Sequence, residues 1–207
     1  MIDGRLTLRA PHLAGYGAIC ADWDSADQRR RILGGRKQLL AKAVGLHKTP
    51  EPHVLDGTAG LGRDGYTLAA LGATVTLMER APALVLLLRD AHRRALESPA
   101  LQDVAQRIDV LEGDTHKLAA SEPRWDVVVL DPMYPDDGKS ALPSKEMQVL
   151  RDLTGGDADA DELLAAALAA ARQRVVVKRP AKAPWMAGRK PNLQLIGTQA
   201  RFDIYLR

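Results

Sequence analysis

The chain has 207 residues, 46% hydrophobic and 27% charged, which is enough for one sizeable apolar core but not for two full domains. Its single cysteine, Cys20, excludes an intramolecular disulfide and a cysteine-rich zinc cluster, and we expect no metal. No apolar run approaches the ~20 residues of a membrane helix, and the N-terminus has no apolar signal core. The composition predicts a soluble, cytoplasmic protein without a membrane partner, and its net charge is only +3.

Strand-like and helix-like patterns alternate along the chain from about residue 50. Short apolar or β-branched runs predict strands at 54–55, 74–78, 108–111, 127–130, 175–177 and 202–206, and helical periodicity predicts helices at 66–71, 84–96 and 161–171. Such alternation indicates right-handed crossovers and a mostly parallel sheet with helices on both faces. We therefore predict a doubly wound, Rossmann-like α/β domain over residues 50–207. Residues 1–49 form an N-terminal extension that we expect to pack against the domain or its substrate.

Ligands of a doubly wound fold bind beyond the carboxyl ends of the strands, so the residues that follow each strand are candidates for a site. The first strand leads into Asp56 and a turn with Gly60 and Gly62, which permit close approach of the backbone to a ligand. The turn lacks the full G-x-G-x-x-G pattern of dinucleotide sites. Because a glycine turn is also common in ordinary loops, it does not establish a ligand by itself.

Acidic residues follow the next three predicted strands. Glu79 comes 23 residues after Asp56, close to the ~20-residue spacing of the acid that binds ribose hydroxyls. After the third strand, Gly113 gives backbone access and Asp114 can accept a hydrogen bond from an adenine amino group. The fourth strand ends in Asp131-Pro132-Met133-Tyr134-Pro135. Each acid alone is equally typical of a cap or a turn, but four polar groups at successive strand ends indicate a ligand site.

Together these motifs resemble those of class I S-adenosylmethionine (SAM)-dependent methyltransferases. The runs DGTAGLGRDGY, MERAP, LDPMYP, KSALPSKEM, VVVKRP and RFDIY are similar, more specifically, to the ribosomal RNA small subunit methyltransferase J family, over about residues 6–205. The resemblance implies a SAM cofactor and methylation of the exocyclic N2 of a guanine in 16S rRNA, either as naked RNA or in the small ribosomal subunit. The cofactor residues that we place in this site are Asp56, Gly60, Gly62, Arg63, Asp64, Glu79, Arg80, Gly113, Asp114 and Asp131.

The run DPMY resembles loops of the type acid or asparagine, proline, proline, aromatic, although Met133 replaces the second proline. An exocyclic amine is a poor nucleophile because its lone pair is delocalised into the base. In such loops the acid and a backbone carbonyl accept the two amino hydrogens and direct the lone pair at the methyl carbon. We assign these roles to Asp131 and the carbonyl of Pro132. Tyr134 is expected to stack on the unstacked target base, a contact worth ~1–3 kcal/mol.

Positive residues follow the fourth and fifth strands on the same edge of the predicted sheet. We place four of them near the RNA phosphates: Lys139, Lys145, Lys178 and Arg179. Two wider blocks, within residues 29–42 and 172–190, favour nucleic acid over a protein partner, although each block alone is also typical of a solvated surface. The histidines His47, His53, His92 and His116 lack ligand-like spacing, and we interpret them as solvated or capping residues.

Three alternatives stay open on the sequence alone. A methyltransferase of the same type could act on adenine N6 in DNA or on a protein glutamine, because the same loop serves any planar amine or amide. A non-catalytic RNA-binding module could retain the fold, although Asp131 and Tyr134 argue against it. A nicotinamide dehydrogenase is disfavoured by Asp56 and by the incomplete glycine pattern.

Overall fold

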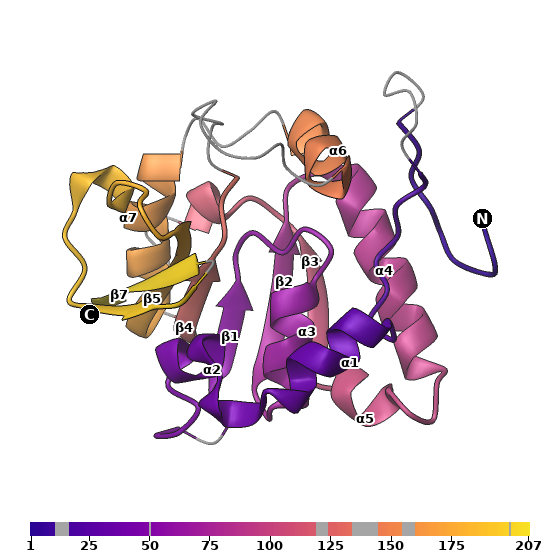
Figure 1. The fold of residues 1–207 in the computed structure, drawn as a ribbon, viewed down its shortest axis with the longest axis horizontal. Coiled ribbons are helices and arrows are strands. Elements are labelled where there is room, and N and C mark those ends of the chain that lie inside the picture. Colours follow the sequence, from indigo (N-terminus) through magenta and orange to yellow (C-terminus); the bar gives the residue numbers. More distant parts are fainter. Residues whose placement is uncertain (11–16, 50, 119–123, 134–144, 155–159, 199) are drawn as a thin grey trace.

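One sheet of seven strands, in the order β3-β2-β1-β4-β5-β7-β6, organises the protein (Figure 1). The computed structural model describes residues 1–10, 17–49, 51–118, 124–133, 145–154, 160–198 and 200–207, except the side chains of residues 145, 147, 151, 152, 154, 160 and 161. The strands are β1 (His53–Asp56), β2 (Thr74–Glu79), β3 (Ile108–Glu112), β4 (Trp125–Leu130), β5 (Ala171–Pro180), β6 (Leu193–Ile196) and β7 (Ala200–Leu206). Strands β1 to β5 pair in parallel, whereas β7 pairs antiparallel with both β5 and β6. The predicted doubly wound, mostly parallel sheet is confirmed.

The central strands are continuous apolar runs because both of their faces are buried. Successive side chains of a strand point to opposite faces. Accordingly, Val127 and Val129 of β4 join one hydrophobic cluster, while Val128 and Leu130 join the other. The first cluster includes side chains of α2 (Leu39–Val44), α3 (Arg63–Ala70), α4 (Pro82–Leu96) and α6 (Lys145–Thr154). The second lies beneath α7 (Ala160–Ala170) and the short helix η3 (Met186–Gly188), so helices cover both faces of the sheet.

Local sequence signals fix where several helices begin. Ser25 caps α1 (Ala26–Leu33): its hydroxyl accepts a hydrogen bond from the Gln28 backbone N–H. Pro82 occupies the first turn of α4, where a missing N–H costs no hydrogen bond. The remaining elements are short: α5 (Gln102–Ala105), η1 (Gly35–Lys37) and η2 (Thr115–Leu118). Among the described residues, no helix is long and apolar enough to cross a membrane.

The N-terminal extension shares the core of the sheet domain. Trp23 is buried, stacks on Tyr66 of α3 with ring centroids 5.0 Å apart, and donates from its indole N–H to the Leu61 carbonyl at 3.0 Å. Gln28 of α1 donates to the Arg63 carbonyl and to the Thr67 hydroxyl. The extension therefore packs directly on the turn that links β1 to α3.

The structure contains elements that the sequence patterns did not predict. Strand β6 has four residues and lies at the edge of the sheet, where three of its four side chains are exposed. Four residues make only about one helical turn, or two repeats of the apolar-polar alternation of a strand. The strand β6 and the four-residue helix α5 therefore carry almost no periodic signal in the sequence. Helix α1 was also missed, although the run Ser25, Asp27, Gln28 marks its start.

Candidate active site

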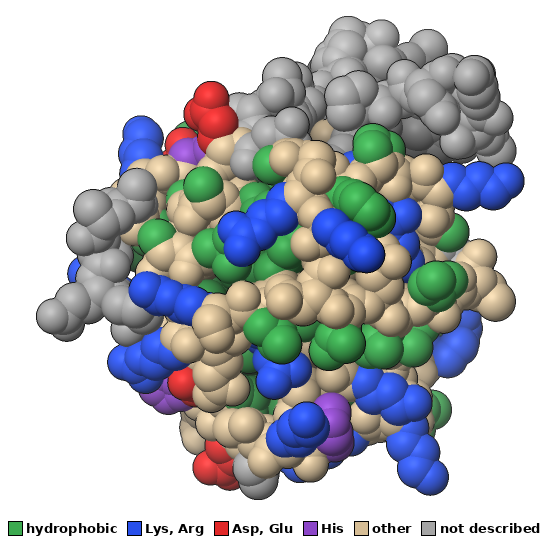
Figure 2. All heavy atoms as spheres, turned by 90° about the vertical axis from the view of Figure 1, so that its left-hand side faces the viewer, with side chains coloured by type: hydrophobic (Ala, Val, Ile, Leu, Met, Phe, Trp, Pro, Cys, Tyr) green, Lys and Arg blue, Asp and Glu red, His purple; other side chains and the backbone are tan. Residues whose placement is uncertain are grey.

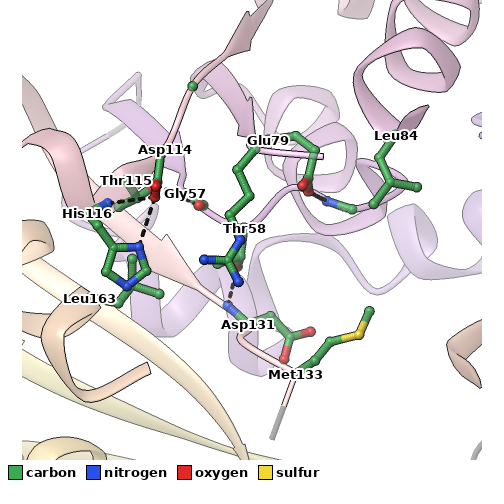
Figure 3. Close-up of a pocket in the computed structure, with 13 residues that line it drawn as sticks. Gly57, Thr58, Glu79, Leu84, Asp114, Thr115, His116, Asp131, Met133 and Leu163 are labelled. Carbon is green, nitrogen blue, oxygen red and sulfur yellow. Dashed lines mark hydrogen bonds and ion pairs between the residues drawn. The ribbon is translucent and has the colours of Figure 1, made fainter. Parts of the chain in front are cut away.

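A pocket lies at the carboxyl ends of β1, β2, β3 and β4 (Figure 3). The space it encloses together with its open mouth is about 490 Å³. Parallel strands bring their carboxyl ends to one edge, so residues distant in sequence meet there. The lining residues are Gly57, Thr58, Gly60, Glu79, Arg80, Leu84, Gly113, Asp114, Thr115, His116, Asp131, Met133 and Leu163.

The glycine turn after β1 is held by the carboxylate of Glu79. The Glu79 Oε2 accepts from the Gly60 N–H, and its Oε1 accepts from the Ala81 N–H, both at 2.9 Å. Gly60 has a φ of +56° and Gly62 a φ of +74°, values that favour glycine. At Gly62 a Cβ would also meet the Trp23 ring at 3.0 Å. Burial raises the pKa of Glu79 above its ordinary value, although the N–H groups of Ala81 and Gly60 oppose this rise.

Asp114 forms the adjacent wall of the pocket with His116. The Asp114 Oδ1 accepts from the His116 N–H at 3.1 Å and lies 2.8 Å from the His116 Nδ1 (Figure 3). Burial opposes the charge of Asp114, but these contacts with His116 outweigh it and lower the pKa of the carboxyl. Thr115 lies behind them and donates from its hydroxyl to the Gly57 carbonyl at 2.6 Å. The η2 turn and the glycine turn are thus joined beneath the pocket.

A network of charged groups lies beside Asp131 at the carboxyl end of β5. The Lys178 Nζ is 2.7 Å from the Asp131 Oδ2 and 2.9 Å from the Asp64 Oδ2. Asp64, at the start of α3, also pairs with the guanidinium of Arg31 from α1. Burial would lower the pKa of Lys178, but the carboxylates of Asp131 and Asp64 outweigh it and raise that pKa well above its ordinary value. Lys178 is therefore charged whenever its two partners are.

Asp131 stands between this network and the pocket. Its backbone N–H donates to the Thr58 hydroxyl at 2.7 Å, which fixes the start of the loop that follows β4 (Figure 3). Its side chain is 45% exposed, whereas that of Asp64 is 14% exposed. Of the two carboxylates that pair with Lys178, that of Asp131 is consequently the one that a ligand can reach.

Asp56 lies beneath the site rather than in its wall. Only 4% of the residue is exposed, and burial raises its pKa to about 7, with a further contribution from Asp64. Between the pKa of the unfolded chain, ~4, and about 7, the folded protein holds a proton that the unfolded chain releases. The stability that this proton contributes is complete at low pH and is lost as the pH rises through about 7.

We expect Asp56→Asn to remove this pH dependence. From about pH 5 to about pH 8, the free energy of unfolding of the unchanged protein should fall by roughly 2–3 kcal/mol more than that of the variant. Urea unfolding of both proteins at the two pH values measures the difference. Parallel losses of stability in the two proteins would mean that Asp56 does not titrate in this range.

The structure brings six of the predicted cofactor residues into the pocket wall: Gly60, Glu79, Arg80, Gly113, Asp114 and Asp131. The four others lie outside the wall. Asp56 and Gly62 lie beneath the turn, Asp64 holds Lys178, and the Arg63 guanidinium contacts both carboxylate oxygens of Glu146 in α6 at 2.7 and 2.9 Å. These four can influence a ligand mainly through the residues they hold in place.

The predicted catalytic and RNA-contacting residues are described only in part. Tyr134 and Lys139 lie outside the described residues, as does the side chain of Lys145. Arg179 is 3% exposed, so it cannot contact a phosphate at the surface as the sequence suggested. Lys178 occupies the two carboxylates described above instead of facing solvent freely.

Several pocket residues were not singled out from the sequence. Thr58, Thr115 and His116 each lie within two residues of a predicted strand-end acid. The signal that could have predicted them is therefore their place in the loops that follow the strands. His116, interpreted from the sequence as a solvated or capping residue, contacts Asp114 and lines the pocket. Arg31 had no comparable signal, because α1 reaches Asp64 only through the tertiary fold.

Comparison with known proteins identifies the family. A family model described as "Putative SAM-dependent methyltransferase" matches residues 1–207. A Pseudomonas aeruginosa (strain LESB58) protein named ribosomal RNA small subunit methyltransferase J is 50% identical over 182 residues, which cover 86% of this chain and 69% of that protein. The chain belongs to the ribosomal RNA small subunit methyltransferase J family.

Two further relatives of this chain agree with the assignment to the methyltransferase J family. A protein of the same name from Thioalkalivibrio sulfidiphilus (strain HL-EbGR7) is 45% identical over 212 residues, which cover 100% of this chain and 83% of that protein. The crystal structure of a SAM-dependent methyltransferase from Neisseria gonorrhoeae is 42% identical with a TM-score of 0.74, and the match covers 97% of this chain and 78% of that one. The sheet of this methyltransferase J family member is thus the class I methyltransferase sheet predicted from the sequence.

The pocket fits the SAM cofactor of the family. At Gly60 nothing lies within 4 Å of the position of a Cβ, so the turn leaves open space above its backbone. The carboxylates of Glu79 and Asp114 stand at the ends of neighbouring strands and offer acceptors to hydroxyl and amino donors. An adenosine with a free ribose presents those donors. We conclude that the residues present suit the cofactor that the family implies.

Proposed function

We propose that this methyltransferase transfers a methyl group from SAM to the exocyclic N2 of a guanosine in 16S rRNA. The observation that carries the proposal is the partly exposed carboxylate of Asp131, which stands at the pocket wall at the start of the DPMY loop. Its relatives are named for the ribosomal RNA of the small subunit. With that substrate we place the protein in the cytoplasm, where it would act on naked rRNA or on the small subunit.

The cofactor site follows from the pocket wall. We propose that Glu79 accepts hydrogen bonds from the ribose hydroxyls, since each of its oxygens has a second lone pair beyond the one that takes a backbone N–H. Asp114 makes both of its contacts to His116 through Oδ1, which leaves Oδ2 for the adenine amino group. Gly60 and Gly113 allow close approach of the backbone. Arg80 lines the same wall and is assigned to the cofactor by the family resemblance.

The acceptor side of the reaction belongs to Asp131. SAM supplies an electrophilic methyl group. We propose that the Asp131 carboxylate and the Pro132 carbonyl accept the two hydrogens of the guanine amino group and orient its lone pair. As the new C–N bond forms and the S–C bond breaks, the amine loses one proton, which Asp131 can receive. Tyr134 keeps the stacking role that the sequence assigns to it.

Lys178 and Asp64 have a supporting part in this proposal. An ionised carboxylate accepts hydrogen bonds from both sides, whereas a protonated one loses part of that capacity. Burial raises the pKa of Asp131, and the charge of Lys178 at 2.7 Å opposes that rise and favours the ionised form. Asp64 with Arg31 holds Lys178 in place. Lys178 thus acts on the reaction through Asp131 rather than on an RNA phosphate. Arg63 in turn links the start of α3 to α6 through Glu146.

Methyl transfer from labelled SAM tests the function. The substrates are small ribosomal subunits and naked 16S rRNA, both from cells that lack this protein, and the products are digested to nucleosides. Label in N2-methylguanosine is the expected result, and the better substrate shows when in assembly the enzyme acts. Label in another nucleoside would overturn the N2 assignment. No label in either RNA, despite SAM binding, would redirect the search to DNA and protein substrates.

We expect Glu79→Ala to weaken SAM binding about 10- to 100-fold, because hydrogen bonds to a charged acceptor contribute roughly 1.5–3 kcal/mol. Isothermal titration with SAM measures the change in Kd. Glu112→Ala is the matched control, since Glu112 pairs in register with Glu79 on the neighbouring strand but its side chain is exposed and bound to Arg89. Equal affinity of the Glu79 variant and the unchanged protein would refute the ribose assignment.

A further inference from the structure

The net charge of +3 conceals a separation of charge along the chain. Residues 28–50 contain seven Lys and Arg, residues 163–202 contain eight, and neither segment contains a single Asp or Glu. The rest of the chain therefore carries all 26 acidic residues against 14 basic ones. A stretch of forty residues without an acid is not what an ordinary solvated surface of mixed charge requires.

The fold brings the two acid-free segments together. Helix α2 from the first segment packs on β5, β6 and β7 from the second. The Arg174 guanidinium of β5 donates to the Ala43 carbonyl of α2, and it lies 3.1 Å from the position of a Cβ at Gly45. Leu39 of α2 likewise contacts the turn at Gly197. Figure 2 looks onto this end of the molecule: Lys and Arg side chains are spread over it, while Asp and Glu side chains lie at its margins.

Six of the exposed cations of these segments make up a surface that we call the basic end. They are Lys37, Lys42, Lys48, Lys182, Arg189 and Lys190. Within the part of the chain that the structure describes, none of the six has a carboxylate at ion-pair distance. By contrast, Arg89, Arg93 and Arg107 elsewhere on the surface each pair with an acid. The six like charges repel one another unless an anion binds them.

The basic end adjoins the active site. Lys182 follows the carboxyl end of β5 by two residues, and Lys178 of the same strand end holds Asp131. Arg189 and Lys190 precede β6, the edge strand, while Lys37, Lys42 and Lys48 lie in or beside η1 and α2 on the other face of the sheet. The charges thus flank the β5-β7-β6 side of the sheet from both faces and extend away from the pocket.

We propose that the basic end binds the phosphate backbone of the rRNA. The RNA held there is the part that runs from the target nucleotide, in the pocket, over the β5-β7-β6 side of the sheet. This inference rests on the proposed function and adds the surface by which the RNA is held. Phosphate contacts position a nucleic acid without reading its sequence. The basic end therefore supplies affinity, and the pocket selects the nucleotide.

Two triple variants test the proposal: K37Q/K42Q/K48Q on the α2 side and K182Q/R189Q/K190Q on the β6 side. Filter binding to naked 16S rRNA at several KCl concentrations gives the slope of log Kobs against log salt. Each phosphate contact contributes about 0.7 to 0.9 to that slope, so each variant should lower its magnitude by about 2 to 3. The KM for rRNA should rise at least tenfold, with the Kd for SAM and the thermal unfolding midpoint unchanged.

The variant R89Q/R93Q/R107Q is the matched control, because it removes three cations that already have carboxylate partners, and its slope should not change. A fall of less than one in either basic-end variant, or an equal fall in the control, overturns the proposal. So does a loss of binding to assembled small subunits with full affinity for naked rRNA, which would indicate a ribosomal protein partner. If the unchanged protein binds rRNA through the six cations but methylates none, the proposed function fails and the basic end stands.

Discussion

Asp131→Ala is expected to lower kcat for methyl transfer about 100- to 1,000-fold, the usual cost of removing one preorganised group that stabilises a transition state. The carboxylate lies at the pocket wall, and of the two carboxylates that pair with Lys178 it is the more exposed. The Kd for SAM should change much less than kcat, because Glu79 and Asp114 still hold the adenosine. Single-turnover transfer and SAM titration of the same preparations separate the two effects.

Asp126→Ala is the matched control for that variant. Asp126 belongs to the same strand, β4, but lies near its amino end, where its carboxylate accepts from the His53 N–H at 2.9 Å. Its removal should leave kcat within a factor of about two, since surface substitutions away from special features usually cost little. Full activity of Asp131→Ala would mean that another group accepts the amino hydrogens.

Lys178→Met should shift the acid limb of the pH–rate profile to higher pH by one unit or more. Without the ammonium, Asp64 and Asp131 face each other with less positive charge nearby, so the pKa of the Asp131 carboxyl rises and its ionised form is lost at a higher pH. The free energy of unfolding should also fall by about 2–3 kcal/mol, less than for a fully buried pair because the Lys178 side chain is 24% exposed.

Lys178→Arg separates charge from structure in this experiment. Arginine retains the positive charge, so the acid limb should stay close to that of the unchanged protein even if the bulkier group lowers kcat. A profile that moves equally in both variants, or in neither, would show that Lys178 does not set the ionisation of Asp131. Measurements from about pH 5 to about pH 9 cover the range that this test needs.

The sequence predicted the sheet well because its central strands are buried on both faces. The runs 127–130 and 175–177 are wholly apolar, which is typical of such buried strands, and they lie in β4 and β5. The strand-end acids Glu79, Asp114 and Asp131 could be predicted because the fold class fixes which end of each strand carries the site. What a strand end does not reveal is the direction of each side chain.

Lys178 and Arg179 show this limit. Both follow the apolar run of β5, and both were expected to meet RNA phosphates. Adjacent residues of a strand point to opposite faces, however, so Lys178 turns towards Asp64 on α3 while Arg179 is buried on the other side. The partner Arg31 comes from a helix 33 residues before Asp64, and no local pattern links the two. The network therefore required the tertiary structure.

The contact of Trp23 with the glycine turn makes the amino-terminal segment a reporter of cofactor occupancy. Trp23 and Gln28 are hydrogen-bonded to the carbonyls of Leu61 and Arg63, on the same turn that Glu79 holds from the pocket side. A ligand that binds only the folded form of this turn stabilises, against local unfolding, the Trp23 ring and the helix α1 that pack on the turn. Amide protons of α1 should then exchange more slowly when SAM is bound, so isotope exchange in this helix, which lies outside the pocket wall, reports whether the pocket is occupied.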